Sequence, residues 1–84
     1  MSDAQFFGPS VPASKAVAIT PDDSEDIGIT RGIYVAASGD LTVIMADDSE
    51  EVTFTDIAAG VVHPLRVKRV LDTGTDATGI IGLY

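Results

Sequence analysis

The sequence of 84 residues contains no cysteine and no tryptophan, and it has a single histidine. Without cysteine the chain forms no disulfide and no thiolate metal site, and one histidine excludes a multi-histidine site within one chain. A domain of this size buries only about 60–65% of the surface of its unfolded chain, so its core supplies on the order of 3–5 kcal/mol of stability. Subunit contacts are the remaining support, and we expect the chain to act as one copy among several in an assembly.

Basic residues are also scarce, since 5 Lys and Arg stand against 13 Asp and Glu, for a net charge of −8. This charge repels the phosphates of nucleic acids and anionic membrane surfaces. No stretch approaches the ~18 apolar residues that span a bilayer, and Met1–Ser10 lacks the pattern of a targeting signal. Hydrophobic residues nevertheless make up 45% of the chain, too many for a disordered acidic tail. We therefore expect a folded domain that binds neither nucleic acid nor membrane and places apolar surface in interfaces.

Short apolar runs alternate with turn residues from Lys15 onward, which predicts an all-β domain over residues 15–84, a small antiparallel β-sandwich or barrel of about six strands. The expected strands are Lys15–Ile19, Gly32–Ala37, Leu41–Ala46, Glu51–Thr55, Leu65–Leu71 and Gly79–Tyr84. The third run is apolar on both faces, which predicts a central strand. Ser38-Gly39-Asp40 predicts a tight hairpin between the second and third strands. The last strand is expected to be paired, because a free apolar edge invites aggregation.

Residues 1–14 show neither a helical nor a strand period, and their prolines hold the backbone extended, so we expect an N-terminal arm. Phe6 and Phe7 are adjacent in this arm and need burial because of their large apolar area. Two alternatives follow: the pair folds back on its own domain, or it docks on a neighbouring subunit.

Two acidic clusters, residues 22–26 and 47–51, raise the question of a calcium site. Asp22, Ser24 and Asp26 alternate as ligands do in calcium-binding loops. An EF-hand, however, needs glycine directly after the third ligand and glutamate at position twelve, and isoleucine stands at both places. We therefore interpret both clusters as solvated acidic loops, and we predict no metal and no cofactor.

Three of the five basic residues, Arg66, Lys68 and Arg69, lie close together, and Arg31 precedes another expected strand. No aromatic residue is interleaved among them for base stacking. We therefore predict that they pair with acidic loops, within the chain or across a subunit boundary, where such pairs set register and specificity. Strand alternation places Arg66, Lys68 and Val70 on one face of the fifth run.

Catalytic motifs are absent from the sequence. His63 stands beside a turn, without a serine and an acid at a spacing that suggests a triad. The glycines at 74 and 79 are isolated and form no phosphate-binding loop. We therefore predict that the protein is not an enzyme and has no catalytic residue.

Several segments together resemble a known family. They are Ala16–Ser24, Thr30–Val35, Gly39–Val43 and the closing Pro64–Ile80. In order and spacing these segments resemble the spike base proteins of gene transfer agents (GTAs) and related tailed phages, and the likeness runs from Lys15 to Tyr84. Its specificity comes from the whole string rather than from any single motif.

The resemblance implies a β-rich structural virion protein on the outer surface of the capsid. Copies would form the base of a head spike at the vertices, where a separate fibre attaches, in contact with the major capsid protein. Vertex location implies a fivefold ring, and the lack of cysteine fits assembly in the host cytoplasm. The family has no catalytic residues to carry over. The interface candidates are Phe6, Phe7, Arg31, Arg66, Lys68 and Arg69.

Three alternatives stay open at this stage. The first is a capsid decoration protein, often a trimer, which oligomeric order distinguishes from a pentameric spike base. The second is a carbohydrate-binding module at a host surface, weakened because Tyr34 and Tyr84 are the only tyrosines and tryptophan is missing. The third is a calcium-stabilised adhesion module, which a chelator would test.

Overall fold

The structure is a computed structural model that describes residues 12–84, and the statements below refer to that part of the chain. These residues form seven strands and no helix. The strands are β1 (Ala16–Ala18), β2 (Gly32–Ala37), β3 (Gly39–Met45), β4 (Glu51–Ile57), β5 (Val62–His63), β6 (Val67–Val70) and β7 (Thr78–Leu83). The predicted all-β class is thus confirmed. Residues 12–84 hold no helix of a length and apolarity that would cross a membrane.

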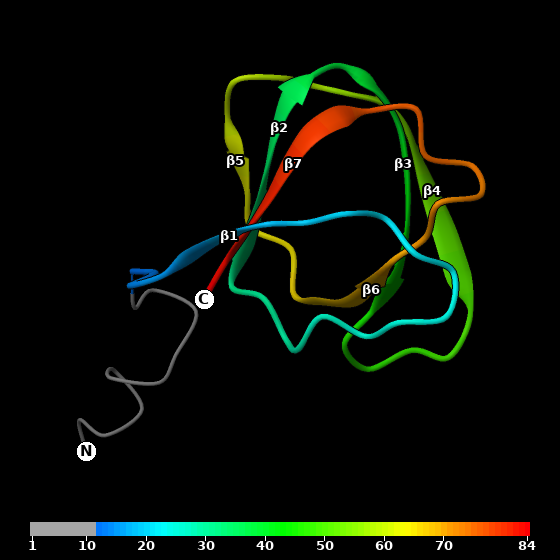
Figure 1. The fold of residues 1–84 in the computed structure, drawn as a ribbon, viewed down its shortest axis with the longest axis horizontal. Coiled ribbons are helices and arrows are strands. Elements are labelled where there is room, and N and C mark those ends of the chain that lie inside the picture. The colour runs from blue at the N-terminus through cyan, green and yellow to red at the C-terminus, as the bar shows by residue number, and fades with distance from the viewer. Residues whose placement is uncertain (1–11) are drawn as a thin grey trace.

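The strands form two antiparallel sheets that enclose one core. The four-stranded sheet has the order β1-β7-β2-β5, and the three-stranded sheet has the order β4-β3-β6. Figure 1 shows β2, β5 and β7 on one side and β3 and β4 on the other, with β6 at the bottom. The fully buried side chains come from strands of both sheets: Ile33, Val35, Leu41, Val43 and Val67. Each contributes about 1.5–3 kcal/mol of apolar burial, which offsets the entropy of ordering the chain.

The strand that is apolar on both faces is central, as predicted. β3 pairs with β4 through Leu41↔Phe54 and with β6 through Val43↔Val70. Thr42 faces away from the core yet is 1% exposed, because the segment of residues 74–75 covers it. Its hydroxyl donates to the carbonyl of Gly74 and its N–H donates to the hydroxyl of Thr75, both at 3.0 Å. The predicted pairing of the last strand is also confirmed, since β7 lies between β1 and β2.

The predicted hairpin at Ser38-Gly39-Asp40 is wrong. β2 and β3 follow each other in the chain but belong to different sheets, so this turn carries the chain across the core. Gly39 is required for close packing: an added Cβ would lie 2.6 Å from the backbone nitrogen of Ala77. A short turn with glycine therefore marks a sheet-to-sheet corner here, while residues 46–50 form the hairpin that joins β3 to β4.

Two further details of the strands differ from the sequence prediction. β5 has only two residues, too few to produce a visible alternation, and it was not predicted. In β6 the register moves from Ile44↔Arg69 to Met45↔Val67, so Lys68 has no partner on β3. This β-bulge turns both Val67 and Val70 into the core. Strict alternation placed Val70 on the opposite face and was wrong.

Candidate functional site

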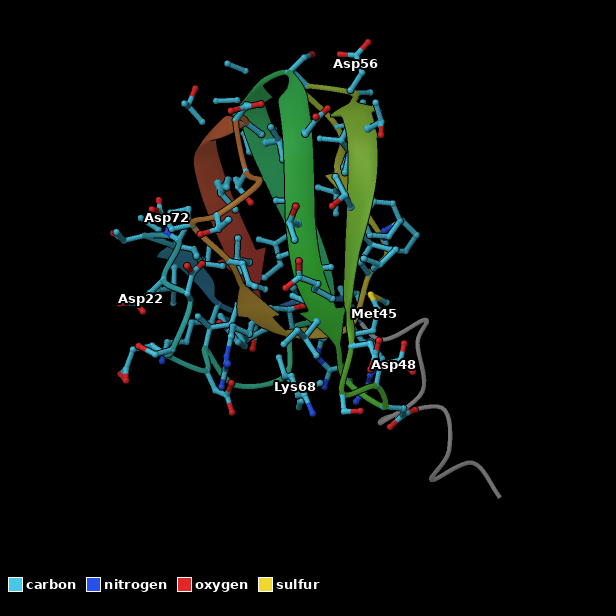
Figure 2. All side chains as sticks on the ribbon, turned by 90° about the vertical axis from the view of Figure 1, so that its right-hand side faces the viewer. Asp22, Met45, Asp48, Asp56, Lys68 and Asp72 are labelled. Carbon is cyan, nitrogen blue, oxygen red and sulfur yellow. The ribbon has the colours of Figure 1, made fainter. Side chains whose placement is uncertain are left out.

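The basic residues gather at one end of the molecule. Arg66 directly precedes β6, which carries Lys68 and Arg69. The segment that contains Arg31 runs beside this strand, because the backbone N–H of Thr30 donates to the carbonyl of Val67 at 3.1 Å. In Figure 2, Lys68 lies at the lower end of the sheets and Asp56 at the upper end. The fold therefore brings together residues that are up to 38 positions apart in sequence.

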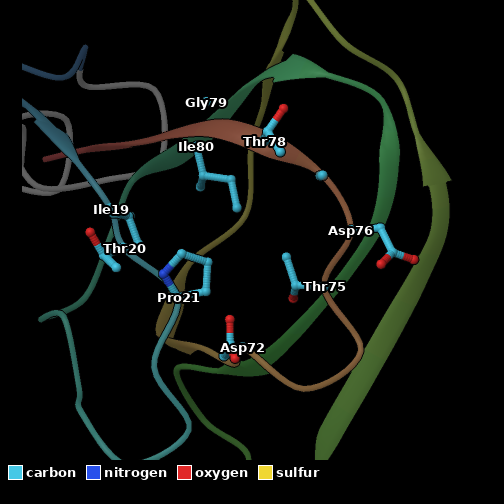
Figure 3. A pocket seen from close by; sticks show the side chains of 10 residues that line it. Ile19, Thr20, Pro21, Asp72, Thr75, Asp76, Thr78, Gly79 and Ile80 are labelled. Atoms are coloured by element: carbon cyan, nitrogen blue, oxygen red, sulfur yellow. The ribbon is translucent and has the colours of Figure 1, made fainter.

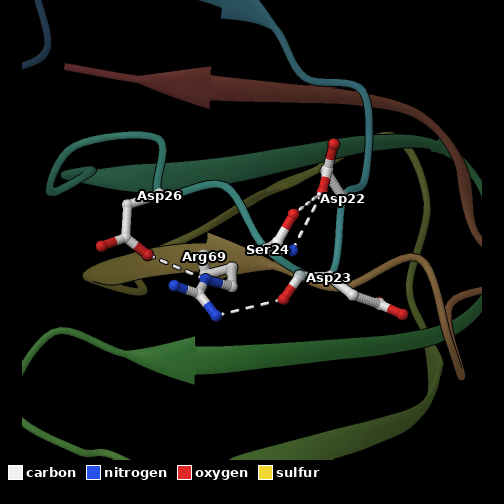
Figure 4. A network of polar contacts seen from close by, with 5 residues as sticks. All are labelled: Asp22, Asp23, Ser24, Asp26 and Arg69. Atoms are coloured by element: carbon white, nitrogen blue, oxygen red, sulfur yellow. Dashed lines mark hydrogen bonds and ion pairs between the residues drawn. The ribbon is translucent and has the colours of Figure 1, made fainter.

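Arg69 forms an ion pair within the chain. Its Nε donates to the carboxylate of Asp26 at 2.8 Å, and its Nη1 donates to the backbone carbonyl of Asp23 at 3.1 Å. Figure 4 shows both interactions across the surface of β6. The side chains are 28% and 58% exposed, so solvent screens the pair and its energetic contribution is at most about 1 kcal/mol. Its main effect is to position the loop of residues 22–26 against β6.

Asp23 fastens the same loop to the segment that follows β6. Its carboxylate accepts the backbone N–H groups of Asp72 and Thr73 at 2.8 and 2.9 Å, and the hydroxyl of Thr73 at 2.6 Å. These hydrogen bonds, above all the one from the Thr73 hydroxyl, lower the pKa of Asp23 below its ordinary value. We call this arrangement the Asp23 clasp. Nothing in the local sequence pointed to it, because its partners lie about fifty residues away in the chain.

The first acidic cluster is therefore more than a solvated loop. Asp22 makes a local turn, in which its carboxylate accepts the N–H and the hydroxyl of Ser24 at 2.9 and 3.0 Å. Asp22 and Asp26 turn to different partners in Figure 4 and do not converge. Within residues 12–84, no group of three or more His, Asp or Glu side chains is arranged to hold a metal ion. The second cluster, residues 47–51, is exposed.

The remaining interface candidates occupy different surroundings. Arg66 is exposed, whereas Arg31 and Lys68 are half-buried. Phe6 and Phe7 lie outside the described residues. The interface roles of these residues stay predictions, while Arg69 takes the intrachain partner that the sequence analysis left open as one alternative.

Thr30 is a buried polar residue that the sequence analysis missed. Its side chain is 0% exposed. Its hydroxyl donates to the carbonyl of Leu65 at 2.9 Å and accepts the backbone N–H of Val67 at 3.0 Å. One hydroxyl thus satisfies two backbone groups at the start of β6, the carbonyl of Leu65 and the N–H of Val67. These bonds hold the segment that contains Arg31 next to the other basic residues.

A shallow pocket of about 340 Å³ lies between the end of β1 and the segment that leads into β7. Figure 3 shows Pro21 and Ile80 in its wall, with Asp72 and Asp76 at its border. The hydroxyl of Thr75 in this wall accepts the backbone N–H of Thr42 at 3.0 Å. The pocket therefore offers carboxylates and a small apolar surface, and the hydroxyl of Thr75 is occupied by the backbone of β3.

His63 is not part of this pocket. It lies in β5, and its Nε2 is 2.8 Å from the carbonyl oxygen of Ala58, in the connection between β4 and β5. The histidine therefore anchors the connection between β4 and β5.

Comparisons with known proteins give a match among solved structures. No protein-family model matches the chain, and no curated protein matches it. Among solved structures, the chain is similar to one chain of a structure described as "Capsid of native GTA particle computed with C5 symmetry". The identity is 36%, the match covers 92% of this chain and 89% of that chain, and the TM-score is 0.80.

Fold and match together define the class: a small two-sheet β protein related to a component of a capsid structure. At this identity, over nearly the whole of both chains, the protein belongs to the same family as that GTA capsid chain. The resemblance noted from the sequence is thus confirmed at the level of a GTA capsid-associated protein.

Proposed function

We propose that this chain forms the oligomeric base of a head spike at the vertices of a phage or GTA capsid, on its outer surface. One observation carries the proposal: the 36% identity to a chain of a GTA capsid structure, over 92% of this chain. This match supports a structural, capsid-associated role directly. The spike base is the finer assignment, and it rests on the sequence segments that resemble spike base proteins.

A ring of five copies is the oligomer that we propose. The related capsid structure was computed with C5 symmetry, and a capsid vertex offers five equivalent neighbours around one axis. A small domain without disulfides gains stability from such contacts. The basic end of the molecule and its exposed acidic loops provide complementary charges for neighbouring copies. A trimer would instead favour a capsid decoration protein that lies between neighbouring capsid subunits.

The proposed partners are further copies of this chain, the major capsid protein and a spike fibre protein. We propose assembly in the host cytoplasm and a final location on the virion. We also propose that the protein has no enzymatic activity. The surroundings of His63 and of Thr75 in the pocket support this, since both side chains bond to backbone atoms.

Native mass spectrometry of the purified full-length chain tests the oligomer. A discrete pentamer supports the spike base, whereas a trimer contradicts it in favour of a decoration protein. In a second experiment, the protein is added to capsids that lack it, and its co-sedimentation with them is measured. The bound copies are then located by imaging. Density at the fivefold vertices is expected. Binding spread over the capsid facets, or no binding at all, would contradict the proposal.

A further inference from the structure

The two sheets differ sharply in the side chains that they turn away from the core. In the four-stranded sheet, the register of β1, β7, β2 and β5 aligns alternate residues on the outer side. Six of these residues are apolar or aromatic: Ala16, Ala18, Tyr34, Val62, Ile81 and Leu83. We call this surface the apolar face. Val62 is the most open of its larger side chains, at 56% exposure.

The other positions on this face are small and uncharged. Gly32 lies among larger neighbours, since an added Cβ would be 3.0 Å from Cγ1 of Val62 and 3.6 Å from Cδ1 of Leu83. Gly79 lies beside Ala36, and an added Cβ would overlap the Cβ of that alanine. The apolar face therefore has no charged side chain at these aligned positions, and its glycines allow the neighbouring side chains to pack close together.

The three-stranded sheet instead has polar side chains on its outer side, where the segment of residues 74–75 covers Thr42. Its outer side carries Thr42 opposite Thr53, and Ile44 lies between Glu51 and Arg69. An antiparallel sheet with one solvated face normally alternates in this way between apolar and polar residues. The four-stranded sheet breaks that alternation on its outer side, and an uncharged sheet face of this kind marks an interaction surface.

We propose that the apolar face binds residues 1–11 of a neighbouring copy, with Phe6 and Phe7 as the side chains that pack on it. The inference rests on the proposed assembly of copies, and it adds the surface and the segment that join them. Residues 1–11 contain two of the three phenylalanines of the chain and only one ionisable side chain, Asp3. The part of this segment around the two phenylalanines, residues 4–11, has no charged side chain and is complementary to an uncharged apolar face.

Length and position support this occupant. Eleven residues in extended form reach about 36 Å, whereas the outer strands of a four-stranded sheet lie only about 14 Å apart. The described chain begins at the border of the same sheet, where the N–H of Ser14 donates to the carbonyl of Tyr84 at 2.7 Å. The segment is therefore attached next to an apolar face and is long enough to span one.

The direction of the chain favours the face of a neighbour over its own. Residues 12–15 are exposed, and they prolong the line of β1 toward the end of β7. A segment that continues in this direction leaves its own sheet, and it would have to turn back to cover its own apolar face. Exchange of an identical element between copies avoids this reversal and closes a ring by a head-to-tail contact.

Cysteine cross-linking tests the proposal on the full chain, which has no native cysteine. One variant carries Phe7→Cys and is labelled with 15N, and the other carries Val62→Cys without label. The two are mixed, oxidised and measured by mass spectrometry, which identifies the mixed disulfide by its mass. Val61→Cys is the matched control, because Val61 is adjacent, is 49% exposed and lies before the β5 register. We expect at least about tenfold more mixed disulfide with Val62→Cys than with the control.

The double variant Phe7→Cys with Val62→Cys separates the two possible sources of the segment. Disulfides between copies support the proposal. A disulfide that forms only within one copy overturns it in favour of the chain's own segment, and an excess below about twofold over the Val61 control overturns the contact altogether. Far-UV circular dichroism verifies that each variant retains its β structure.

A second pair of variants tests the contribution to assembly. Val62→Asp places a charge on the apolar face, whereas Val61→Asp adds the same charge beside it. We expect Val62→Asp to raise the dissociation constant of the oligomer at least about tenfold and Val61→Asp less than about twofold, because a buried unpaired charge is costly. Equal effects overturn the proposal. If the wild-type chain is oligomeric but the cysteine variants form no excess of mixed disulfide over the control, this inference alone is refuted. A monomeric wild-type chain refutes the proposed assembly as well.

Discussion

Replacement of Thr30 by valine tests how strongly one buried hydroxyl supports this fold. Valine has nearly the same shape, so the substitution removes the hydroxyl and leaves the packing largely unchanged. The N–H of Val67 and the carbonyl of Leu65 then lose their partners. Each buried backbone group without a partner costs about 1–3 kcal/mol. We expect a total loss of about 2–4 kcal/mol, since Leu65 is only half-buried and water reaches its surroundings.

That loss is comparable to the whole stability of a domain of this size, on the order of 3–5 kcal/mol. Urea unfolding followed by far-UV circular dichroism measures it, at one protein concentration for all variants because assembly adds stability. The thermal midpoint should fall by at least about 10 °C.

Thr30→Ser is the matched control, because it keeps the hydroxyl and removes only a methyl group, at a loss of about 1 kcal/mol. Valine should therefore be worse than serine. If serine is the more damaging substitution, or if valine changes the stability by less than about 0.5 kcal/mol, the hydroxyl does not have the assigned role.

Three more predictions concern acid stability, backbone strain and assembly. The hydrogen bonds from Thr73 lower the pKa of Asp23, so its carboxylate stabilises the folded state above about pH 4, and this contribution is lost as the pH falls through the lowered pKa. Asp23→Asn should therefore make the free energy of unfolding fall less steeply with decreasing pH. Equal slopes of this free energy against pH in the two proteins would contradict the prediction. Gly79→Ala should destabilise by about 1–3 kcal/mol more than Gly60→Ala, because both glycines have positive φ but only the first would overlap Ala36; equal midpoints in urea would refute the steric argument. The dissociation constant of the oligomer should rise at least about tenfold from about 0.05 M to about 1 M NaCl, because salt screens the charges of the basic end; an unchanged oligomer mass would count against charge pairing between copies.

The strands were predictable from the sequence where their signal is local. Alternation and turn residues located β2, β3, β4 and β7 within a few residues, and the two-sided apolar character of β3 identified its central place. Pairing between sheets is not a local property, and so Ser38-Gly39-Asp40 suggested a hairpin where the chain crosses the core. The bulge at Lys68 escaped prediction for the same reason, because it depends on the register with β3.

The candidate site was predictable only in part. The charge pattern indicated that basic residues pair with acidic loops, and Arg69 does so with Asp26. The sequence did not reveal the partners of Asp23 and Thr30, which lie about fifty and 35 residues away. The apolar face left a signal that was not used: β2 and β7, like β3, are apolar on both faces. Apolar residues on both sides of β2 and β7 predict that the outer side of their sheet is covered, in addition to the side that faces the core.

The segment between β6 and β7 has a consequence for engineering. It binds along the edge of β3, where the N–H of Asp76 donates to the carbonyl of Asp40 at 2.8 Å and the hydroxyl of Thr75 accepts the N–H of Thr42. This segment is not a strand, but it hydrogen-bonds to β3 as β4 and β6 do. Added residues would break these hydrogen bonds. The exposed hairpin of residues 47–50 lacks such ties to a neighbouring strand. An inserted peptide therefore belongs in that hairpin, where the chain can lengthen without opening the sheet.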